Sequence, residues 1–213
     1  FRLLPPSPRR RKVTPSRIGE EAPSPVLPDE TRPRAAAAAP LYGRERSAAE
    51  FGTAVHELFE RIEWLAQTPE TLFAGNDSPE AVVVRAALNV PAVAALFRPQ
   101  TGQEVYNEQD MDALWTLDGE EVWVSGTIDR LVLPRDADGR VIDAHIIDFK
   151  TDLRDDTLSP EAQDAALCDR HRPQMQSYTK LVAAAFALSA EQVHVTLISV
   201  PSNGEEPRAV EVL

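Results

Sequence analysis

Two strand-like runs joined by a polar loop constrain the fold of this chain more than any other feature. The runs EVWVSGTIDRLVL (121–133) and VIDAHIIDFK (141–150) are rich in β-branched and aromatic residues, which favour strands. The segment between them, 134–140, contains Asp138-Gly139, a dipeptide typical of turns. The sequence therefore predicts an antiparallel hairpin across these two runs.

Helical patterns precede this hairpin. Apolar residues recur every three or four positions from about residue 47 to residue 67, and Ser47 with Glu50 fits a capping box at the start of that helix. Residues 79–97 indicate one or two further helices, interrupted at Pro91.

The elements that follow the hairpin complete the expected fold class. We expect a short helix over residues 160–168 and a longer one that Pro173 opens and that ends near residue 188. Two strands, 193–200 and 208–213, close the chain around the turn Ser202-Asn203-Gly204. This order of elements predicts an α/β (α+β) fold with a mixed central sheet flanked by helices.

Residues 1–40 differ from the rest of the chain in composition. They hold nine of the 18 prolines, the basic run Arg9-Arg10-Arg11-Lys12 and an alanine tract at 35–39. Proline at this density disfavours helix and sheet alike, so we expect a linker or strap before a folded domain over residues 41–213. The basic run has two open interpretations, a contact to phosphate or a solvated tail.

The charge of the chain is unevenly distributed. The formal net charge is −12, but residues 1–34 carry eight Lys or Arg against four Asp or Glu, which leaves 14 basic and 30 acidic residues, or −16, for the remainder. Broad affinity for DNA needs clustered basic residues that displace counterions, and an acidic domain lacks them. The composition suits a domain that binds cations and receives its nucleic acid from another module.

The cysteine content and the first residues indicate the cellular location to expect for the chain. A single cysteine, Cys168, excludes an internal disulfide and a cysteine-ligated iron–sulfur cluster, and a reducing cytoplasm is the default. The chain opens with Phe1 and shows neither a membrane-length apolar run nor a signal peptide's layout. We therefore expect a soluble, cytoplasmic fragment of a longer protein.

Two charged residues end the second strand-like run. Asp148 and Lys150 are two positions apart, so they point to the same face of a strand, which Ile142, Ala144 and Ile146 mark as the covered face. Burial of charge is costly unless the charge is paired or bound to a metal. A structural Asp–Lys ion pair is one interpretation of the pattern, and a functional site is the other.

Asp129 favours the functional interpretation. It lies near the end of the first run, where a hairpin would bring it toward Asp148. Two converging carboxylates repel each other, and a divalent cation relieves the repulsion. Oxygen ligands favour Mg²⁺ or Mn²⁺ over zinc. Gly126, three residues before Asp129, would allow close approach of backbone or ligand.

Residues of two predicted helices could complete such a site. His56 lies beside the apolar stripe of the first helix, where it is either a half-buried side chain or a nitrogen ligand. Gln174 and Tyr178 are four positions apart and share a helix face, so they either form a routine surface or orient the site's carboxylates and a phosphate.

Four motifs in order carry a family resemblance. The segments GTAVHELFE, GTIDRL, IIDFKTD and HRPQMQSY are similar to those of the RecB-type exonuclease family in the PD-(D/E)xK nuclease superfamily. The chain most resembles the C-terminal nuclease domains of AddA-type helicase–nuclease subunits, which act in double-strand-break repair. The segment Thr14-Pro15-Ser16-Arg17-Ile18 resembles the lead into that domain, so the resemblance spans essentially the whole chain.

The resemblance implies a restriction-endonuclease-like core and a role for each motif residue. His56, Asp129, Asp148 and the Phe149 carbonyl would be metal ligands. Lys150 would orient or polarise the attacking water, while Gln174 and Tyr178 would support DNA and site geometry. For the glutamate that relatives carry on the preceding strand, Glu104 is the first choice and Glu108 the second.

The implied activity is that of a Mg²⁺-dependent deoxyribonuclease, with Mn²⁺ as a substitute, that digests DNA as an exonuclease. The implied partners are DNA fed from a helicase motor, the rest of that helicase chain and an AddB-like subunit. The sequence contains no Gly-x-x-x-x-Gly-Lys-Ser/Thr phosphate loop, so the ATP-driven motor lies elsewhere. A catalytically inactive DNA-binding module and a protein-interaction module of the same fold are the alternatives.

Overall fold

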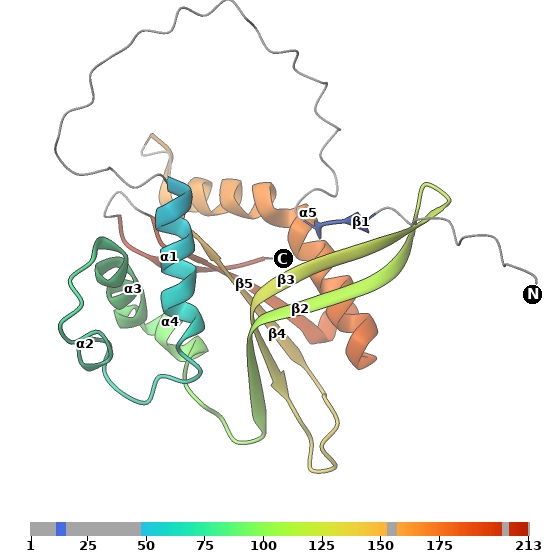
Figure 1. The fold of residues 1–213 in the computed structure, drawn as a ribbon, viewed down its shortest axis with the longest axis horizontal. Coiled ribbons are helices and arrows are strands. Elements are labelled where there is room, and N and C mark those ends of the chain that lie inside the picture. Colours follow the sequence, from blue (N-terminus) through green and yellow to red (C-terminus); the bar gives the residue numbers. More distant parts are fainter. Residues whose placement is uncertain (1–11, 16–47, 153–156, 202–204, 213) are drawn as a thin grey trace, which may run out of the picture.

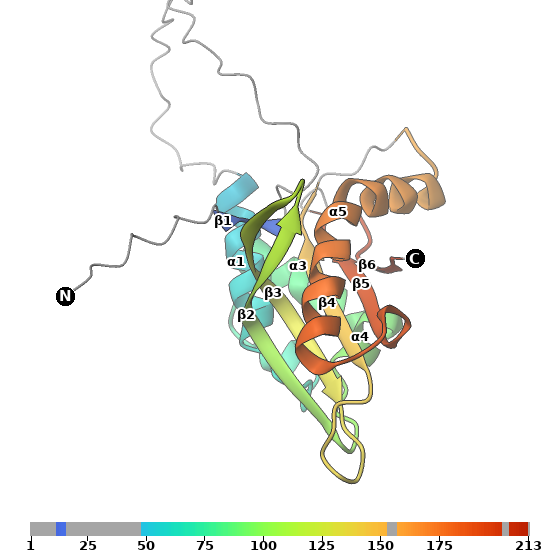
Figure 2. The same cartoon turned by 90° about the vertical axis from the view of Figure 1, so that its right-hand side faces the viewer.

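A mixed β-sheet lies between two layers of helices in the computed structural model, which describes residues 12–15, 48–152, 157–201 and 205–212 (Figure 1). On one face lie α1 (Ala48–Glu60), α2 (Pro69–Leu72), α3 (Pro79–Asn89) and α4 (Pro91–Leu96), and on the other lies α5 (Pro160–Phe186). Figure 2 shows the sheet edge-on between α1 and α5. The predicted mixed sheet flanked by helices is confirmed.

A long antiparallel hairpin forms one side of the sheet. Strands β2 (Gln103–Leu117) and β3 (Glu120–Pro134) pair along nearly their whole length. Strand β4 (Ala144–Lys150) runs antiparallel to β3, as predicted. The sheet continues with β5 (Val193–Ser199), which is parallel to β4 and is preceded by the short η2 turn (Ala190–Gln192), and ends with the antiparallel β6 (Arg208–Glu211).

Strand β3 changes partners along its length. Its residues 130–132 pair with β4, whereas Trp123 and Val124 pair in parallel with β1 (Lys12–Val13). Because β2 occupies the opposite side of β3 throughout, β1 and β4 follow one another along the same side. The two strands β3 and β4 therefore separate directly before Arg130, at Asp129, and the site described below lies at this separation.

Two apolar clusters hold the helices onto the sheet. The first lies between the sheet and α5 and includes Ile128, Ile146 and Met175. The second lies between the sheet and α1–α4 and includes Phe59 and Ile147. Each fully buried large side chain contributes about 1.5–3 kcal/mol, so packing fixes both helical layers against the strands.

Pro173 lies inside α5, and the predicted division into two helices is wrong. Proline removes one helical hydrogen bond and its ring crowds the preceding turn, at a cost of about 3 kcal/mol. Leu167 before it and Met175 after it are nevertheless buried in the same apolar cluster. Packing on both sides therefore outweighs the local cost, and α5 bends instead of ending, as its change of direction in Figures 1 and 2 shows.

Other differences from the expected elements have simple causes. The resemblance implies a strand around Glu104, but residue patterns do not delimit β2, because its residues alternate between half-buried and exposed. Ile142, expected on the covered face, precedes β4 and is 47% exposed. Lys12 and Val13 form a strand within the proline-rich segment, because β3 offers them an edge where it no longer pairs with β4.

Several expectations concern residues that the structure does not describe. Most of the predicted linker and the turn at 202–204 lie outside the described residues. Among the helices of the described ranges, none has the length and apolar character needed to cross a membrane.

Candidate metal centre

The β2–β3 hairpin changes its facing pattern at one point. Up to Ile128 the even-numbered residues of β3 pack toward α5, whereas beyond it Leu131 and Leu133 do so. The register pairs Asn107 with Arg130 and Gln109 with Ile128, which leaves Glu108 opposite Asp129 between these pairs. Glu108 has a left-handed φ of 50°, so the regular pleat of the strand is interrupted there. The side chains of Glu108 and Asp129 therefore project from the hairpin at the same place. Figure 1 shows the hairpin bent partway along its length.

Asp129 connects three elements at this break. Its Oδ2 accepts a hydrogen bond of 2.8 Å from the backbone N–H of Phe149 on β4. The same oxygen lies 3.4 Å from Nδ1 of His56 on α1. A hydrogen bond from the main chain of β4 takes the place of a regular ladder contact, so the carboxylate marks the point where β3 and β4 separate.

Helix α1 approaches the strands closely enough to bring His56 to Asp129. A Cβ at Gly52 would lie 2.9 Å from Thr151 Oγ1, so glycine permits this contact at the end of β4. Val55 is completely buried and anchors the helix one residue before His56. The His56 ring meets the Phe149 ring edge-on at 5.7 Å, which fixes its orientation.

Three side chains converge with the geometry of a metal site. His56, Glu108 and Asp129 each offer one ligand atom, and these atoms all lie within 4.8 Å of one another. One imidazole nitrogen and two carboxylate oxygens are donors that suit Mg²⁺ or Mn²⁺. The donor set and its spacing therefore fit a divalent cation.

Glu104, the first choice for the additional glutamate, lies elsewhere. Its Oε2 accepts hydrogen bonds from Arg135 Nη2 at 2.7 Å and from the Tyr106 hydroxyl at 2.9 Å. Four residues of strand, roughly 13 Å, separate Glu104 from Glu108. The second choice, Glu108, is the one that joins His56 and Asp129. Its place opposite Asp129 in the hairpin register is the signal that distinguishes the two glutamates.

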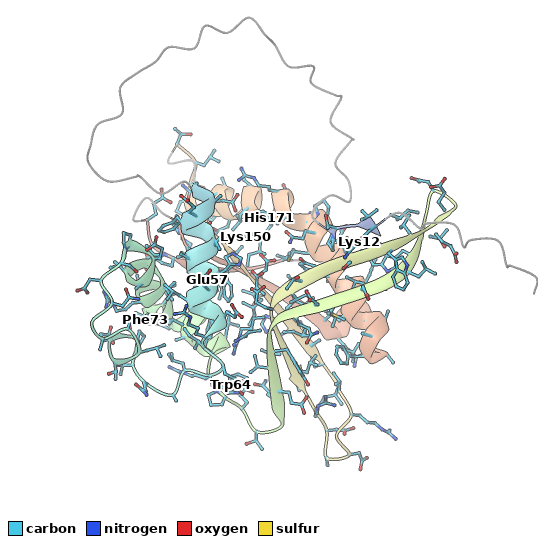
Figure 3. The ribbon with its side chains drawn as sticks, viewed as in Figure 1. Lys12, Glu57, Trp64, Phe73, Lys150 and His171 are labelled. Carbon is cyan, nitrogen blue, oxygen red and sulfur yellow. The ribbon has the colours of Figure 1, made fainter. Side chains whose placement is uncertain are left out.

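Asp148 and Lys150 form a buried pair beside these ligands. Lys150 Nζ lies 2.5 Å from Asp148 Oδ2, and the two side chains are 13% and 2% exposed. Burial, followed by the negative charge of Asp129, raises the pKa of Asp148 to about 6, although Lys150 acts in the opposite direction. Figure 3 shows Lys150 between α1 and α5. Alternation along β4 thus places both residues on one face, as the sequence predicts.

A chain of hydrogen bonds ties Lys150 to α5 and back to β3. Lys150 Nζ donates to Gln174 Oε1 at 3.2 Å, and Gln174 Nε2 donates to the Tyr178 hydroxyl at 3.2 Å. The Tyr178 hydroxyl donates to the Thr127 carbonyl at 2.7 Å. Burial raises the pKa of Tyr178 to about 12, so the phenol keeps its proton for this bond. A Cβ at Gly126 would lie 2.9 Å from the Tyr178 ring, so glycine admits the tyrosine.

Phe149 contributes its backbone and its ring. Its N–H is bonded to Asp129, and its ring stacks on Phe59 at 4.1 Å between the ring centroids. The expected role of its carbonyl as a metal ligand stays a prediction. The structure therefore brings His56, Glu108, Asp129, Asp148, Lys150, Gln174 and Tyr178 into one continuous group and leaves Glu104 outside it.

Comparison with known proteins identifies the family of the chain. The family model described as the PD-(D/E)XK nuclease superfamily matches residues 33–212. No curated protein matches the chain. The solved structure of SSO0001 is one match, with 12% sequence identity, a TM-score of 0.33, and coverage of 80% of this chain and 70% of that one. Because the family model covers most of the sequence, the chain belongs to the PD-(D/E)XK nuclease superfamily.

Proposed function

We propose that this chain is the nuclease domain of an AddA-type helicase–nuclease, which hydrolyses phosphodiester bonds in DNA as a Mg²⁺-dependent exonuclease. Members of its superfamily are generally nucleases that use divalent metal ions. The observation that carries the proposal is the convergence of His56, Glu108 and Asp129 beside the Asp148–Lys150 pair. Residues 41–213 would form the catalytic domain and residues 1–40 its linker.

The residues of the group divide the chemistry among them. His56, Glu108, Asp129 and Asp148 would hold the cation, with the Phe149 carbonyl as a further ligand. A bound Mg²⁺ would lower the pKa of a water molecule and offset negative charge on the phosphate. The Lys150 ammonium, fixed by Gln174, would orient the attacking water and stabilise the charge that develops on the phosphate oxygens.

The acidity of the domain supports delivery of DNA by other parts of a larger assembly. Beyond the first 34 residues of the chain, the net charge is −16, and a domain of this charge has little long-range attraction for DNA. A strand threaded into the site from a helicase motor would not need it, because a high local concentration replaces intrinsic affinity. The proposed partners are therefore the rest of the helicase chain and an AddB-like subunit in the cytoplasm.

A cleavage assay on end-labelled single-stranded DNA tests the proposal. With Mg²⁺ or Mn²⁺ the wild-type chain should release short products, and with a chelator it should release none. Lys150→Ala should slow cleavage by about 10²- to 10³-fold, as loss of a charge-stabilising donor does. Lys180→Ala removes an exposed lysine of α5, whose ammonium lies over the Trp115 ring of β2. This variant should cleave like the wild type.

The same assay separates the exonuclease from its alternatives. Circular single-stranded DNA has no ends and should survive under conditions that digest the linear form. Retention of labelled DNA without cleavage would favour an inactive binding module. Equal cleavage by Lys150→Ala and the wild type would contradict the assigned role of Lys150.

A further inference from the structure

Arg130 is completely buried directly after Asp129. Its Nη1 donates to the Ile62 carbonyl at 2.9 Å and its Nη2 donates to the Glu63 carbonyl at 2.8 Å. These carbonyls belong to the segment that follows α1, the helix that carries His56. A cation placed just beyond the C-terminus of a helix also interacts favourably with the helix dipole. Arg130 thus fastens the end of α1 to β3.

Asn107 makes the second connection, from β2. Its Oδ1 accepts a hydrogen bond from Arg130 Nη1 at 3.1 Å. Its Nδ2 donates to the Glu60 carbonyl at 2.7 Å and to the Ile62 carbonyl at 3.3 Å. Asn107 directly precedes Glu108, and it is the register partner of Arg130. The two side chains therefore bind the same end of α1 from positions adjacent to the two carboxylates of the metal centre.

Aromatic rings link this network to the other end of the site. The Arg130 guanidinium lies 4.4 Å from the centroid of the Phe97 ring and 5.1 Å from that of Trp64, which Figure 3 shows near the lower end of α1. Phe97 also stacks on Phe59, and Phe59 stacks on Phe149, whose ring meets His56. A continuous set of ring contacts thus runs from Arg130 to the imidazole.

Burial of the Arg130 guanidinium carries a desolvation cost that an apolar side chain would not have. Replacement of a buried charged group by apolar residues of similar volume is often neutral or stabilising. Burial also lowers the pKa of Arg130 to about 10, so the side chain is still a cation at neutral pH. What the guanidinium provides and an apolar side chain lacks is a fixed fork of donors directed at named carbonyls.

We propose that Arg130 and Asn107 are positioning residues that hold α1 against the β2–β3 hairpin and so set the separation of His56 from Glu108 and Asp129. The inference rests on the proposed metal site, and it assigns neither residue a direct contact to the cation. Without the clamp, only apolar packing, which is not directional, holds α1 against the hairpin, so the spacing of the three ligand atoms is no longer set.

Calorimetric titration of the full chain with Mn²⁺ tests the clamp. Asn107→Ala, which keeps the Arg130 contacts to α1, should weaken Mn²⁺ binding by about 10-fold, and Arg130→Met by about 100-fold, the range typical of residues that orient ligands. Arg130→Lys should not restore the affinity, because an ammonium cannot reproduce the fork. If Arg130→Met fails to fold, Asn107→Ala still decides the question.

Two controls separate positioning from general loosening. Leu88→Ala creates a cavity in the same apolar cluster from α3, away from α1's carbonyls, and should lower stability while it leaves Mn²⁺ affinity within about twofold of wild type. In a His56→Ala background, Asn107→Ala should cause no further loss of affinity, because the clamp acts through His56.

The outcomes distinguish the clamp from the proposed function. Undiminished Mn²⁺ binding by Asn107→Ala, or an equal loss in Leu88→Ala, would overturn the clamp alone. Absence of Mn²⁺ binding by the wild-type chain would overturn the metal site together with the clamp.

Discussion

The two sides of the site are built by different means. On the α5 side, Asp148 and Lys150 are buried, and side chains hold them through Gln174 and Tyr178. On the α1 side, Glu108 is exposed, and a break in the backbone of β2 places it rather than a side-chain network. Side-chain hydrogen bonds thus hold Asp148 and Lys150 directly, whereas the path of β2 places Glu108. On that second side, hydrogen bonds act on α1 rather than on the carboxylate.

The charge balance of the two sides differs as well. Lys150 offsets Asp148, whereas the α1 side has two carboxylates and one imidazole. Partial burial and the charge of Asp129 raise the pKa of Glu108. Burial lowers the pKa of His56, but the hydrogen bond and charge of Asp129 outweigh it and the net shift is upward. The negative charge of Asp129 contributes to both shifts, and a cation bound here would offset that charge.

Removal of the Asp129 charge should have the largest effect, because this residue faces both sides of the site. Asp129→Asn keeps an oxygen for the Phe149 N–H but loses the anionic ligand. We expect cleavage to fall by about 10³-fold, or ~4 kcal/mol in transition-state stabilisation, and Mn²⁺ binding to fall with it. Single-turnover cleavage and calorimetry measure the two effects.

Asp112→Asn provides a charge-matched control on the same hairpin. Asp112 is an exposed residue of β2, and its substitution should leave cleavage unchanged. Equal losses in the two variants would show that the overall charge of the hairpin, rather than a ligand at Asp129, governs activity.

The buried side should respond to pH when no divalent cation is present. Asp148 has a pKa of about 6 in the folded chain against 3.8 for an unperturbed aspartate, so the folded state binds its proton more tightly. This stabilising contribution is complete below the unfolded pKa and is lost as the pH rises through 6. Between pH 7 and pH 5 the wild type should gain ~1 kcal/mol of unfolding free energy relative to Asp148→Asn.

Chemical denaturation with a chelator at both pH values measures this gain. The asparagine variant has no titrating group at this position, so it serves as the reference for the wild type. Parallel pH dependence in the two proteins would show that Lys150 keeps Asp148 ionised throughout the range.

Sequence rules predict the buried side better than the open one. Alternation along a strand places Asp148 and Lys150 on one face, and the structure has their charged atoms 2.5 Å apart. A four-residue helical spacing likewise places Gln174 beside Tyr178. Both rules depend only on local periodicity, which a single sequence reveals.

The open side depends on features without local periodicity. Glu104 and Glu108 both lie on a strand rich in acidic and polar residues, and only the register of β2 against β3 and the left-handed φ at Glu108 distinguish them. Strand β2 itself lacks a strong apolar pattern, because one of its faces is solvated. Pro173 is the opposite case, in which a strong local signal yields to packing on both sides of α5.

The side-chain network on the α5 side can be weakened one bond at a time. Tyr178→Phe removes the hydroxyl that donates to the Thr127 carbonyl and accepts from Gln174. We expect a loss of about 1 kcal/mol in stability and a several-fold fall in the cleavage rate, with Mn²⁺ affinity retained. Thermal unfolding, cleavage and titration of the same preparation separate these effects. A loss of Mn²⁺ affinity as large as that of Asp129→Asn would mean that the two sides do not act separately.

The two glutamates of β2 give the smallest effect and the sharpest contrast. Glu104 is paired with Arg135 at an exposed position, and surface ion pairs contribute little, so Glu104→Ala should leave cleavage, Mn²⁺ affinity and melting temperature unchanged. Glu108→Ala removes the same group four residues along the same strand but should weaken Mn²⁺ binding, because its oxygen lies with those of His56 and Asp129. Titration of the two variants side by side compares substitutions of equal charge and size in one secondary-structure element. Loss of Mn²⁺ affinity in Glu104→Ala, with Glu108→Ala unaffected, would show that Glu104, the first choice from the sequence, is the ligand. The break in β2 at Glu108 would then have no part in the metal centre.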